Sequence, residues 1–371
     1  MRILVLTKRQ YTARDLLDDR YGRLYELPEA LAKAGHEVMG LVTSYRYRRT
    51  AHHVSAAAVD WQSVNVGPSA PWHWFLWSQK LRRWRPDVIW ASSDAFHCIA
   101  AVALGRKWRV PVVLDLYDNY DHFAATRLPG VSAAYHRACR QASHLTTVSH
   151  ALSEHVSRHI APGVRSTVIP NCVRSDLFRP MDRELCRQQL GLPVDTRLIG
   201  TAGAIHHSRG IEDMFKAFHR LAADDPKLYL VIAGPQDDAV TCFPHPRIIN
   251  LGMLDWTKVP VLINALDVAI VCNRDDSFGR YCHPLKLQEA MACHVPVVAA
   301  AVGDVCRLLA NTPQALYAPG DYIHLATQVR ANLEAPRHAL QIQVPGWSEL
   351  AEKVQGALIQ AIGSANSSHT L

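Results

Sequence analysis

Three features of the sequence predict two doubly wound α/β domains in series. Short, continuous runs of Val, Ile and Leu alternate with amphipathic stretches of helical length along the 371 residues. Such runs are typical of parallel strands that helices cover on both faces. The alternation occurs twice, with a strand-poor segment between the two blocks, and the chain is too long for one ordinary core. Hydrophobic residues make up 49% of the chain and charged residues 20%, which is a globular composition.

The first block contains apolar runs that we expect to be strands, separated by stretches of helical length and period. The stretches 24–36 and 95–109 show that period, and Gly35 stands where a helix commonly ends. The expected strands of this block are 3–7, 37–43, 87–92, 110–116, 144–149 and 166–171.

The second block repeats this pattern after a segment, 173–193, that has no strand signal. We therefore expect an N-terminal domain over 1–175, a C-terminal domain over 176–345, and a final amphipathic helix with a polar tail over 346–371. The expected strands of the second block are 197–203, 228–234, 247–252, 268–273, 295–301 and 315–320.

Several function classes are disfavoured by what the sequence lacks. No GxGxxG follows the first strand and no GxxxxGK[ST] occurs, which argues against a nicotinamide enzyme or a P-loop phosphotransferase. The nine cysteines never form CxxC and the twenty histidines lack ligand spacing, so we expect neither disulfides nor a metal cofactor. No run of about 18 uncharged apolar residues occurs, and the apolar start is too short for a signal peptide. A cytoplasmic protein is expected.

The positive charge is concentrated in the first half. Residues 1–170 hold 22 Lys and Arg against 13 Asp and Glu, whereas the remainder holds 18 against 20. The stretches 44–53 and 71–85 combine these cations with Trp and Tyr, which suits an anionic membrane surface and predicts peripheral attachment to the inner face of the cell membrane. The alternative is that the tryptophans line the core beneath a solvated basic rim. No nucleic-acid module accompanies them, so no nucleic-acid partner is expected.

The stretch HPLKLQEAMACHVPVVAAAVG at 283–303 carries a candidate donor site. His283 and Pro284 suit the cap and first position of a helix, whose free N–H groups attract an anion such as phosphate. Lys286 adds a positive charge, and Glu289 lies one turn further on the same face, where a carboxylate could hold the hydroxyls of a ribose. The pattern predicts a nucleoside diphosphate. The alternative is an ordinary Lys–Glu surface pair.

A second candidate site follows the first strand of the second block, in GTAGAIHHSRGIEDMFKAF (200–218). Gly203 would let the backbone approach a ligand closely, and Arg209 would project from the turn. Arg209 and Lys286 could then converge on one diphosphate, the first as a bidentate fork and the second as a point charge. The sequence AGP at 233–235 would form another wall of the pocket.

EALAKAGHEV, VIPNCVRSDLFRP, GAIHHSRGIEDMFKAF, LYLVIAGP, NALDVAIVCN and PLKLQEAMACHVPVVA occur in this order along the chain. Together they resemble the family-4 glycosyltransferases of the GT-B fold, over nearly the whole sequence. The resemblance implies two Rossmann-like domains facing a central cleft, with a last helix that crosses back to the first domain. It also implies metal-independent transfer, with retained anomeric configuration, from a nucleotide-sugar donor to a saccharide or lipid-linked acceptor in cell-surface polysaccharide or glycolipid synthesis.

Within this resemblance, Glu289 matches the second glutamate of the family's E-x7-E motif, and the first would fall at Tyr281. PLKLQE resembles a subgroup with a PLK-x-x-E pattern, in which the lysine, here Lys286, faces the diphosphate. Arg209 takes the place of a diphosphate-binding lysine, and Ala204 replaces an arginine. The implied catalytic residues are Arg209, Lys286, Glu289 and Asp118, and the implied donor contacts are Gly203, Ala204, His206, Gly234, Pro235, Pro284 and Leu285.

The first domain should supply the acceptor side. The strand at 110–116 ends in a polar cluster in which the family often has histidine and aspartate, and this chain has Tyr117 and Asp118. Asp118 is the candidate to contact a sugar hydroxyl, and the alternative is a turn-forming aspartate before Asn119. The further acceptor-side candidates are Tyr21, Gly22 and Tyr117, and Asp115 and Asp121 are weaker ones.

Two other functions stay open at this point. A nucleotide-sugar epimerase of the same fold would need no acceptor surface. A non-catalytic sugar-nucleotide-binding homologue would be consistent with Tyr281 and Ala204, where the family's glutamate and arginine are absent. In the leading interpretation, Arg209, Lys286 and the helix N-terminus stabilise the departing diphosphate, a contribution of about 3–4 kcal/mol per donor.

Overall fold

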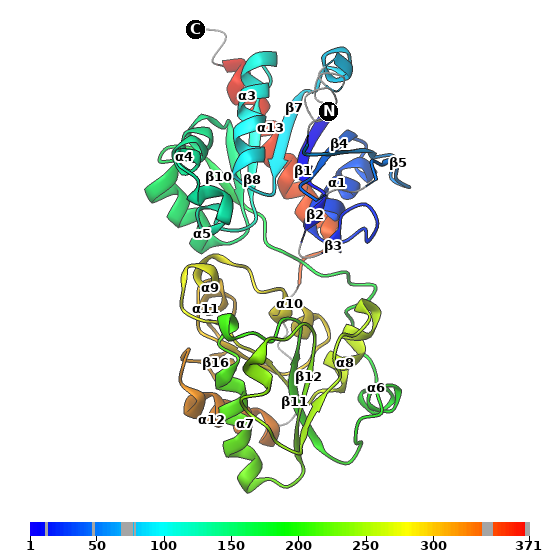
Figure 1. Ribbon diagram of the computed structural model, residues 1–371, viewed down its shortest axis with the longest axis vertical. Helices are drawn as coiled ribbons and strands as arrows, with labels where there is room; N and C mark the ends of the chain where they lie inside the picture. Colours follow the sequence, from blue (N-terminus) through cyan, green and yellow to red (C-terminus); the bar gives the residue numbers. More distant parts are fainter. Residues whose placement is uncertain (12–13, 47–48, 68–76, 78, 336–343, 368–371) are drawn as a thin grey trace. The chain divides into compact units, whose positions relative to one another are not determined.

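The computed structural model describes residues 1–11, 14–46, 49–67, 77, 79–335 and 344–367 (Figure 1). The chain divides into two compact units, one made of Met1–Pro170 with Trp347–Leu371 and the other of Asn171–Gly346. The first unit thus ends a few residues before the expected boundary at 175, and it includes the C-terminal helix. No helix among the described residues has both the length and the apolar character needed to span a membrane.

A mostly parallel eight-stranded sheet forms the centre of the first unit. The strand order is β10-β9-β8-β7-β1-β4-β6-β5, and of these pairs only β5 and β6 are antiparallel. A short hairpin, β2–β3, follows β1. The bounds are β1 (Arg2–Lys8), β2 (Gln10–Tyr11), β3 (Arg14–Asp15), β4 (Glu37–Ser44), β5 (His52–Val54), β6 (Asp60–Asn65), β7 (Val88–Ser92), β8 (Val112–Leu116), β9 (His144–Thr147) and β10 (Ser166–Val168).

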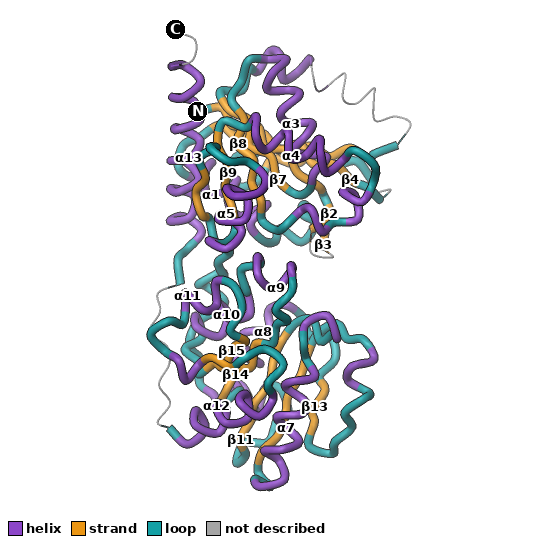
Figure 2. Tube along the Cα trace, turned by 90° about the vertical axis from the view of Figure 1, so that its left-hand side faces the viewer, coloured by secondary structure: helices purple, strands orange, loops and turns teal. Residues whose placement is uncertain are grey.

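Helices cover both faces of this sheet. Helix α3 packs on α4, whereas α1 packs on α13, and Figure 2 shows the second pair on the opposite face. The last helix, red in Figure 1, lies against strands of the first unit, with Leu350, Val354 and Leu358 fully buried. The bounds are α1 (Arg23–Lys33), α3 (Ala95–Trp108), α4 (Val131–Gln141), α5 (His150–His155) and α13 (Trp347–Ser367).

Strand β6 was not expected from the sequence, because DWQSVN has no continuous apolar run. Its place in the sheet is explained by Trp61, which is fully buried and donates a hydrogen bond from its indole N–H to Glu29 Oε1 at 3.0 Å. Gly40 of β4 accommodates this ring, since a Cβ there would lie 2.1 Å from it. The tryptophan therefore packs where β4 has no side chain.

A buried ion pair links α1 to the middle of the same sheet. Arg23 Nη2 donates to Asp115 Oδ1 at 2.8 Å, and both side chains are fully buried. Ser92 and Thr146 also donate to this carboxylate, at 2.8 and 2.7 Å. Such a buried pair is costly to break, because one partner alone would be a buried charge.

The second unit contains a parallel six-stranded sheet in the order β13-β12-β11-β14-β15-β16. Alternate residues of one strand enter two separate cores: Val231 packs in the core under α8 and α10, and Ile232 packs under α7. Both faces are therefore apolar, which explains the continuous Val/Ile/Leu runs. The strands are β11 (Arg197–Ala202), β12 (Leu228–Ala233), β13 (Ile248–Asn250), β14 (Val268–Val271), β15 (Val297–Ala300) and β16 (Leu316–Tyr317). The helices are α6 (Arg183–Gln189), α7 (Glu212–Asp224), α8 (Val259–Ala265), α9 (Ser277–Tyr281), α10 (Leu285–Ala292), α11 (Asp304–Leu308) and α12 (Tyr322–Glu334).

Candidate active site

Lys286 and Glu289 lie in the first two turns of α10, at the carboxyl edge of the second sheet. Pro284, with φ −75° and ψ 103°, occupies the cap position, so the expectation that His283 caps the helix is wrong. His283 lies one residue earlier and is buried. Because a proline has no side-chain acceptor, the first N–H groups of α10 receive no side-chain cap.

Lys286 extends across the end of β11. Its Nζ donates a hydrogen bond to the carbonyl oxygen of Ala204 at 3.1 Å. Burial lowers the pKa of Lys286 to about 8, an effect that the nearby Cys272 and Glu289 oppose and the Arg209 charge reinforces. Burial likewise raises the pKa of Glu289 to about 7, although Lys286 acts against this. The free site therefore holds an ammonium group that lacks full solvation, and a bound anion would favour its charged form.

Two glycines make room for this lysine. Gly203 has φ 103°, and a Cβ at this residue would lie 2.7 Å from Cε of Lys286. Gly234, at the end of β12, has φ 130°, and a Cβ there would lie 2.3 Å from the carbonyl oxygen of Gly203. Both conformations and both contacts require glycine. The two strand ends thus press together directly beneath the lysine side chain.

Arg209 lies in a short 3-10 turn, His207–Arg209, that precedes α7. Its guanidinium carbon stands 3.8 Å from the centre of the Phe278 ring, a cation–π contact with α9. The charge of Arg209 acts on Lys286, so the two cations lie in the same neighbourhood. Like charges held together in this way favour a ligand with more than one negative charge.

The turn that carries Arg209 is fixed by polar contacts on its other side. The backbone N–H of His207 donates to Asp237 Oδ2 at 2.8 Å, and its ring Nδ1 lies 2.6 Å from Glu212 Oε1. Arg274 Nη2 donates to the same Glu212 oxygen at 3.1 Å. Through Glu212 the turn is joined to the segment after β14, and this arrangement orients the turn without any bound ligand.

His207, Asp237 and Asp238 have ligand atoms within 4.8 Å of one another, a spacing that could accept a metal ion. However, Asp237 Oδ1 accepts the N–H of Ala239 and Oδ2 accepts the N–H of His207, which is an ordinary helix-capping role. The imidazole is already shared with Glu212. These contacts engage both oxygens of Asp237 and one ring nitrogen of His207.

The remaining donor-side candidates lie around the same strand ends. The N–H of Ile205 donates to the carbonyl oxygen of Pro235 at 2.9 Å and joins the loop after β11 to the loop after β12. His206 is half-buried just before the Arg209 turn, and Leu285 is the first residue of α10. Tyr281, where the family pattern has a glutamate, ends α9.

In the first unit, Asp118 and Tyr117 follow β8 at the carboxyl edge of the eight-stranded sheet. Asp118 Oδ1 accepts the N–H of Asn119 at 2.7 Å, so its carboxylate has a turn-forming contact. The Tyr117 hydroxyl donates to the carbonyl oxygen of Ser93 at 3.2 Å. Both side chains are half-buried.

Lys8, which our sequence reasoning missed, lies beside these residues. Its ammonium is 5.6 Å from the Tyr117 ring centre, and burial lowers its pKa although Asp94 and Asp118 act to raise it. The neighbouring Ser93 is buried with φ 103°, a rare conformation for a side-chain-bearing residue. This cluster could have been predicted from the polar residues at the ends of two adjacent strands. These residues are KR at 8–9 and SSD at 92–94.

The other first-unit candidates have structural contacts. Asp115 holds the buried Arg23 described above, and Asp121 pairs with His136 at 2.8 Å. Tyr21 lies under the guanidinium of Arg14, at 4.6 Å. Gly22, with φ 78°, is the cap of α1.

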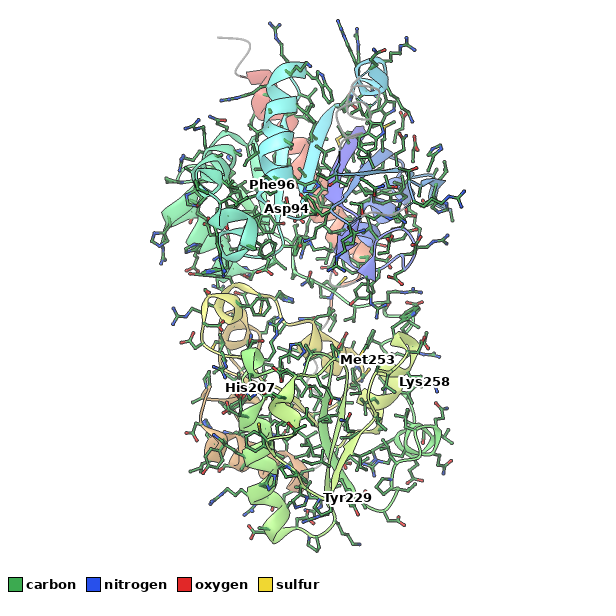
Figure 3. All side chains as sticks on the ribbon, in the orientation of Figure 1. Asp94, Phe96, His207, Tyr229, Met253 and Lys258 are labelled. Carbon is green, nitrogen blue, oxygen red and sulfur yellow. The ribbon has the colours of Figure 1, made fainter. Side chains whose placement is uncertain are left out.

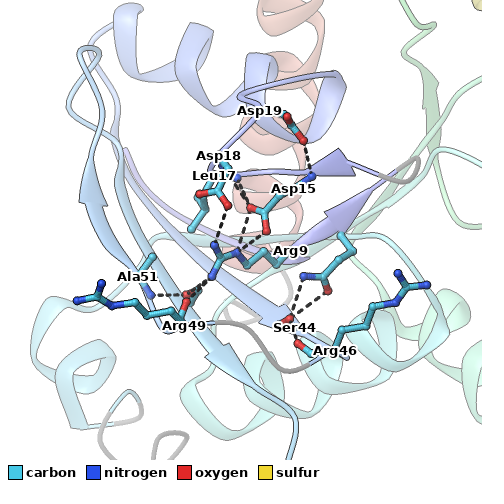
Figure 4. Close-up of polar contacts among 11 residues, drawn as sticks. Arg9, Asp15, Leu17, Asp18, Asp19, Ser44, Arg46, Arg49 and Ala51 are labelled. Carbon is cyan, nitrogen blue, oxygen red and sulfur yellow. Dashed lines mark hydrogen bonds and ion pairs between the residues drawn. The ribbon is translucent and has the colours of Figure 1, made fainter. Parts of the chain in front are cut away.

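Arg9 fixes the loop that follows β4. This buried side chain pairs with Asp15 at 2.9 Å and donates to the carbonyl oxygen of Arg49 at 2.7 Å (Figure 4). Ser44 donates in turn to the carbonyl oxygen of Arg46. These bonds hold the described part of the basic stretch 44–53 at the carboxyl edge of the sheet.

The other basic stretch lies at the opposite edge. Trp84 donates to the carboxylate of Glu37, which is the first residue of β4. Arg46 comes two residues after Ser44, the last residue of the same strand. A strand of this length spans about 25 Å. Exposed arginines 82, 83 and 85 line an open hollow there together with Lys107. The two described stretches therefore do not share a face. Residues 47–48, 71–76 and 78 lie outside the described residues.

Two family models match this chain. A glycosyl transferase 4-like domain matches residues 23–172, and the glycosyl transferases group 1 domain matches residues 182–343. A teichuronic acid biosynthesis glycosyltransferase of Bacillus subtilis, TuaC, is 28% identical over 66% of this chain and 60% of its own length. A D-inositol 3-phosphate glycosyltransferase of Catenulispora acidiphila is 32% identical over 47% and 44%. The match thus spans less than two thirds of the length of each of these two relatives.

A 2-deoxystreptamine glucosyltransferase of Streptomyces kanamyceticus is 27% identical over 73% of this chain and 74% of its own length. Among solved structures, a sucrose-phosphate synthase from Thermosynechococcus elongatus superposes with a TM-score of 0.71 at 18% identity, over 100% of this chain and 98% of that one. Anabaena HepE in complex with UDP gives 0.69 at 20% identity, with the same coverage. These likenesses show that the fold is GT-B.

Proposed function

This chain belongs to the glycosyltransferases that have a glycosyl transferase 4-like domain followed by a group 1 domain, and we propose that it is a sugar transferase. The sugar would move from a nucleoside diphosphate sugar to a saccharide or lipid-linked acceptor. The observation that carries the proposal is the contact of Lys286 with Gly203 at the end of β11, with Arg209 in the turn that follows the same strand. Glycine backbone and paired cations are what close binding of a diphosphate requires.

The diphosphate is proposed to lie over Gly203, with its charge shared between Lys286 and Arg209. The uncapped N–H groups at the start of α10 add a positive dipole end. Glu289, one turn into the helix, would accept the ribose hydroxyls. When the diphosphate departs, negative charge develops on its leaving oxygen and positive charge develops on the sugar. The fixed cations stabilise the negative charge without having to reorganise.

The acceptor is proposed to bind to the first unit near Asp118, which would hold a sugar hydroxyl. Attack from the face of the departing group would retain the anomeric configuration, with the acceptor proton passing to the leaving oxygen. This chemistry needs neither a metal ion nor a nucleophilic side chain. A transfer assay in the presence of EDTA tests the metal independence, and loss of turnover that Mg²⁺ restores would contradict it.

UDP, the ligand of a structural neighbour, is a suitable first probe for the donor site, with GDP alongside it. We expect Lys286→Ala to weaken diphosphate binding about 30-fold or more. The substitution removes the ammonium group that would pair with the diphosphate in a site from which water is largely excluded. Lys258→Ala, which removes an exposed lysine from the same unit, is the matched control. Equal binding by both variants would refute the donor site.

Turnover separates the transferase from its alternatives. The wild-type protein should release nucleoside diphosphate from a nucleotide sugar only when acceptor is present. Conversion of the sugar without acceptor would indicate an epimerase. Tyr281 and Ala204, which replace a glutamate and an arginine of the family pattern, give a specific reason to test a binding-only homologue as well. Diphosphate binding without turnover across many acceptors would favour that function.

Peripheral attachment to an anionic membrane is proposed for the carboxyl-edge stretch alone. Arg46 and Arg49 are exposed there next to Tyr45, which is 47% exposed, and cations beside apolar surface suit a lipid headgroup layer. Arg46→Ser with Arg49→Ser should reduce co-sedimentation with phosphatidylglycerol vesicles. Arg82→Ser with Arg83→Ser, at the other edge, should not. The reverse result would move the contact to the amino edge.

A further inference from the structure

A cavity of about 290 Å³ opens beside the first turn of α3 in the first unit. Carbon atoms from the sheet, the loop after β6 and the helix line it, and Figure 3 labels two residues of this region, Asp94 and Phe96. The apolar lining residues are Leu6, Leu41, Val66, Phe96 and Ala100.

The polar side chains of the lining are engaged with one another. Thr43 Oγ1 lies 2.6 Å from His97 Nε2, and His97 Nδ1 lies 2.8 Å from Asp94 Oδ1. The hydroxyl of Tyr45 donates to the other oxygen of the same carboxylate at 3.0 Å. Since these atoms face their partners, the cavity presents hydrocarbon to a ligand, and a polar group inside it would lose its water without compensation.

Large apolar side chains at the cavity are unusually exposed. Tyr45 is 47% exposed, Val66 53% and Phe96 40%. A contiguous apolar surface of this kind on a folded unit commonly marks a binding site. The loop that carries Tyr45 is held by the Arg9 contacts shown in Figure 4, so the cavity wall is supported in the free protein.

Cations stand next to this apolar surface. Arg46 directly follows Tyr45 and is exposed. Lys8 lies near Asp94, at the carboxyl edge of the sheet where the acceptor is proposed to bind. The cavity therefore combines an apolar interior with two cations at its margin, of which Lys8 lies near the carboxylates of Asp94 and Asp118 and Arg46 is exposed, and this complements a molecule that has a hydrocarbon end and an anionic head.

We infer that this cavity binds the hydrocarbon end of an amphiphilic acceptor whose head carries phosphate. The inference rests on the proposed transferase function and narrows its acceptor to the lipid-linked class. The alkyl or isoprenoid segment would lie against Leu41 and Phe96, and the phosphate would lie toward Arg46 and Lys8. The sugar-accepting hydroxyl would then stand near Asp118.

The test is binding of n-alkyl phosphates below their micelle concentration, measured by calorimetry, with inorganic phosphate as the head-only control. Butyl, hexyl and octyl phosphate should bind the wild-type protein with affinity that rises about fourfold per methylene until the cavity is filled. Inorganic phosphate should bind far more weakly. Equal affinity along the series would overturn the inference.

Ala100→Phe fills the cavity from α3 and should abolish the dependence on chain length. Ala103→Phe makes the same substitution on an exposed position of the same helix and should retain it. If Ala100→Phe fails to fold, Val66→Glu serves instead, because its side chain is half-exposed and its charge opposes an alkyl chain. Unchanged chain-length dependence in the variant that folds would also overturn the inference.

UDP binding is measured on the same preparations. The cavity variants should bind UDP as the wild type does, because the donor site lies in the other unit. A protein that binds UDP and transfers sugar to acceptors without a tail, yet shows no preference for alkyl phosphates, refutes the cavity assignment alone. A protein that binds alkyl phosphates but never turns over a nucleotide sugar refutes the transferase function alone.

Discussion

Replacing Lys286 with methionine should stabilise the second unit and remove donor binding at the same time. The lysine is held beside Gly203 with its pKa lowered from 10.5 to about 8, chiefly by burial. At 1.36 kcal/mol per pH unit, this difference costs the folded state about 3 kcal/mol at neutral pH. Loss of the hydrogen bond to Ala204 offsets about 1 kcal/mol, which leaves a net gain of about 2 kcal/mol.

The size of this effect depends on pH. The folded pKa lies below the unfolded one, so folding of the wild type releases a proton between about pH 8 and about pH 10.5, where the unfolded lysine is protonated and the folded one is not. Wild-type stability should rise with pH through that window, and the advantage of Lys286→Met should shrink over the same range. Affinity for UDP in the wild type should fall above pH 8, because the free lysine then loses its charge.

Thermal unfolding at pH 7 and at pH 10, with and without UDP, measures both effects. For a unit of this size a gain of about 2 kcal/mol raises Tm by about 4–8 °C. Lys258→Met, at an exposed position, should change neither Tm nor UDP binding. A Lys286→Met protein that is less stable than the wild type at pH 7, or stabilised equally at pH 10, would refute the assignment of a desolvated ammonium.

Three further substitutions test the packing around the two sheets. Gly234→Ala should lower Tm by more than 5 °C, which corresponds to about 2 kcal/mol, because the new Cβ would meet backbone at 2.3 Å. Gly252→Ala is the control, with φ 63° and nothing within 4 Å, and it should be destabilised only by the smaller conformational strain. Asp115→Asn should lower the free energy of unfolding of the first unit by about 3–5 kcal/mol in urea, since its arginine partner is fully buried, and a loss below 1 kcal/mol would contradict that. Phe278→Leu should lower kcat/KM for the donor several-fold, because Arg209, which is proposed to stabilise the departing diphosphate, loses its ring contact; an unchanged kcat/KM would contradict this.

Continuous apolar runs predicted the strand positions well. The observed β1, β4, β7 and β8 fall within a residue or two of the expected ranges, because burial on both faces leaves a direct mark on the sequence. Strand β6 was missed for the converse reason. It lies near the sheet edge, where only some of its side chains are buried, and its mixed composition gives neither an apolar run nor a clean alternation.

The candidate site was only partly predictable. The spacing of Lys286 and Glu289 on one helix indicated that they share a face, and Gly203 indicated a close approach. Sequence spacing could not show that the ammonium would bond to Ala204, since that contact joins residues 82 positions apart. The cavity beside Phe96 was equally invisible, because its lining comes from separate strands and a helix whose register only the fold determines.

The position of α13 has a consequence for biosynthesis. Helix α13 follows the second unit along the chain and yet packs on the first unit, so the first unit has no finished apolar face until α13 has been synthesised. The second unit, by contrast, is encoded as one uninterrupted segment and can fold earlier. Nascent chains that stop before Trp347 should therefore expose the surface that Leu350 and Leu358 normally cover, and such products should depend on chaperones or be degraded.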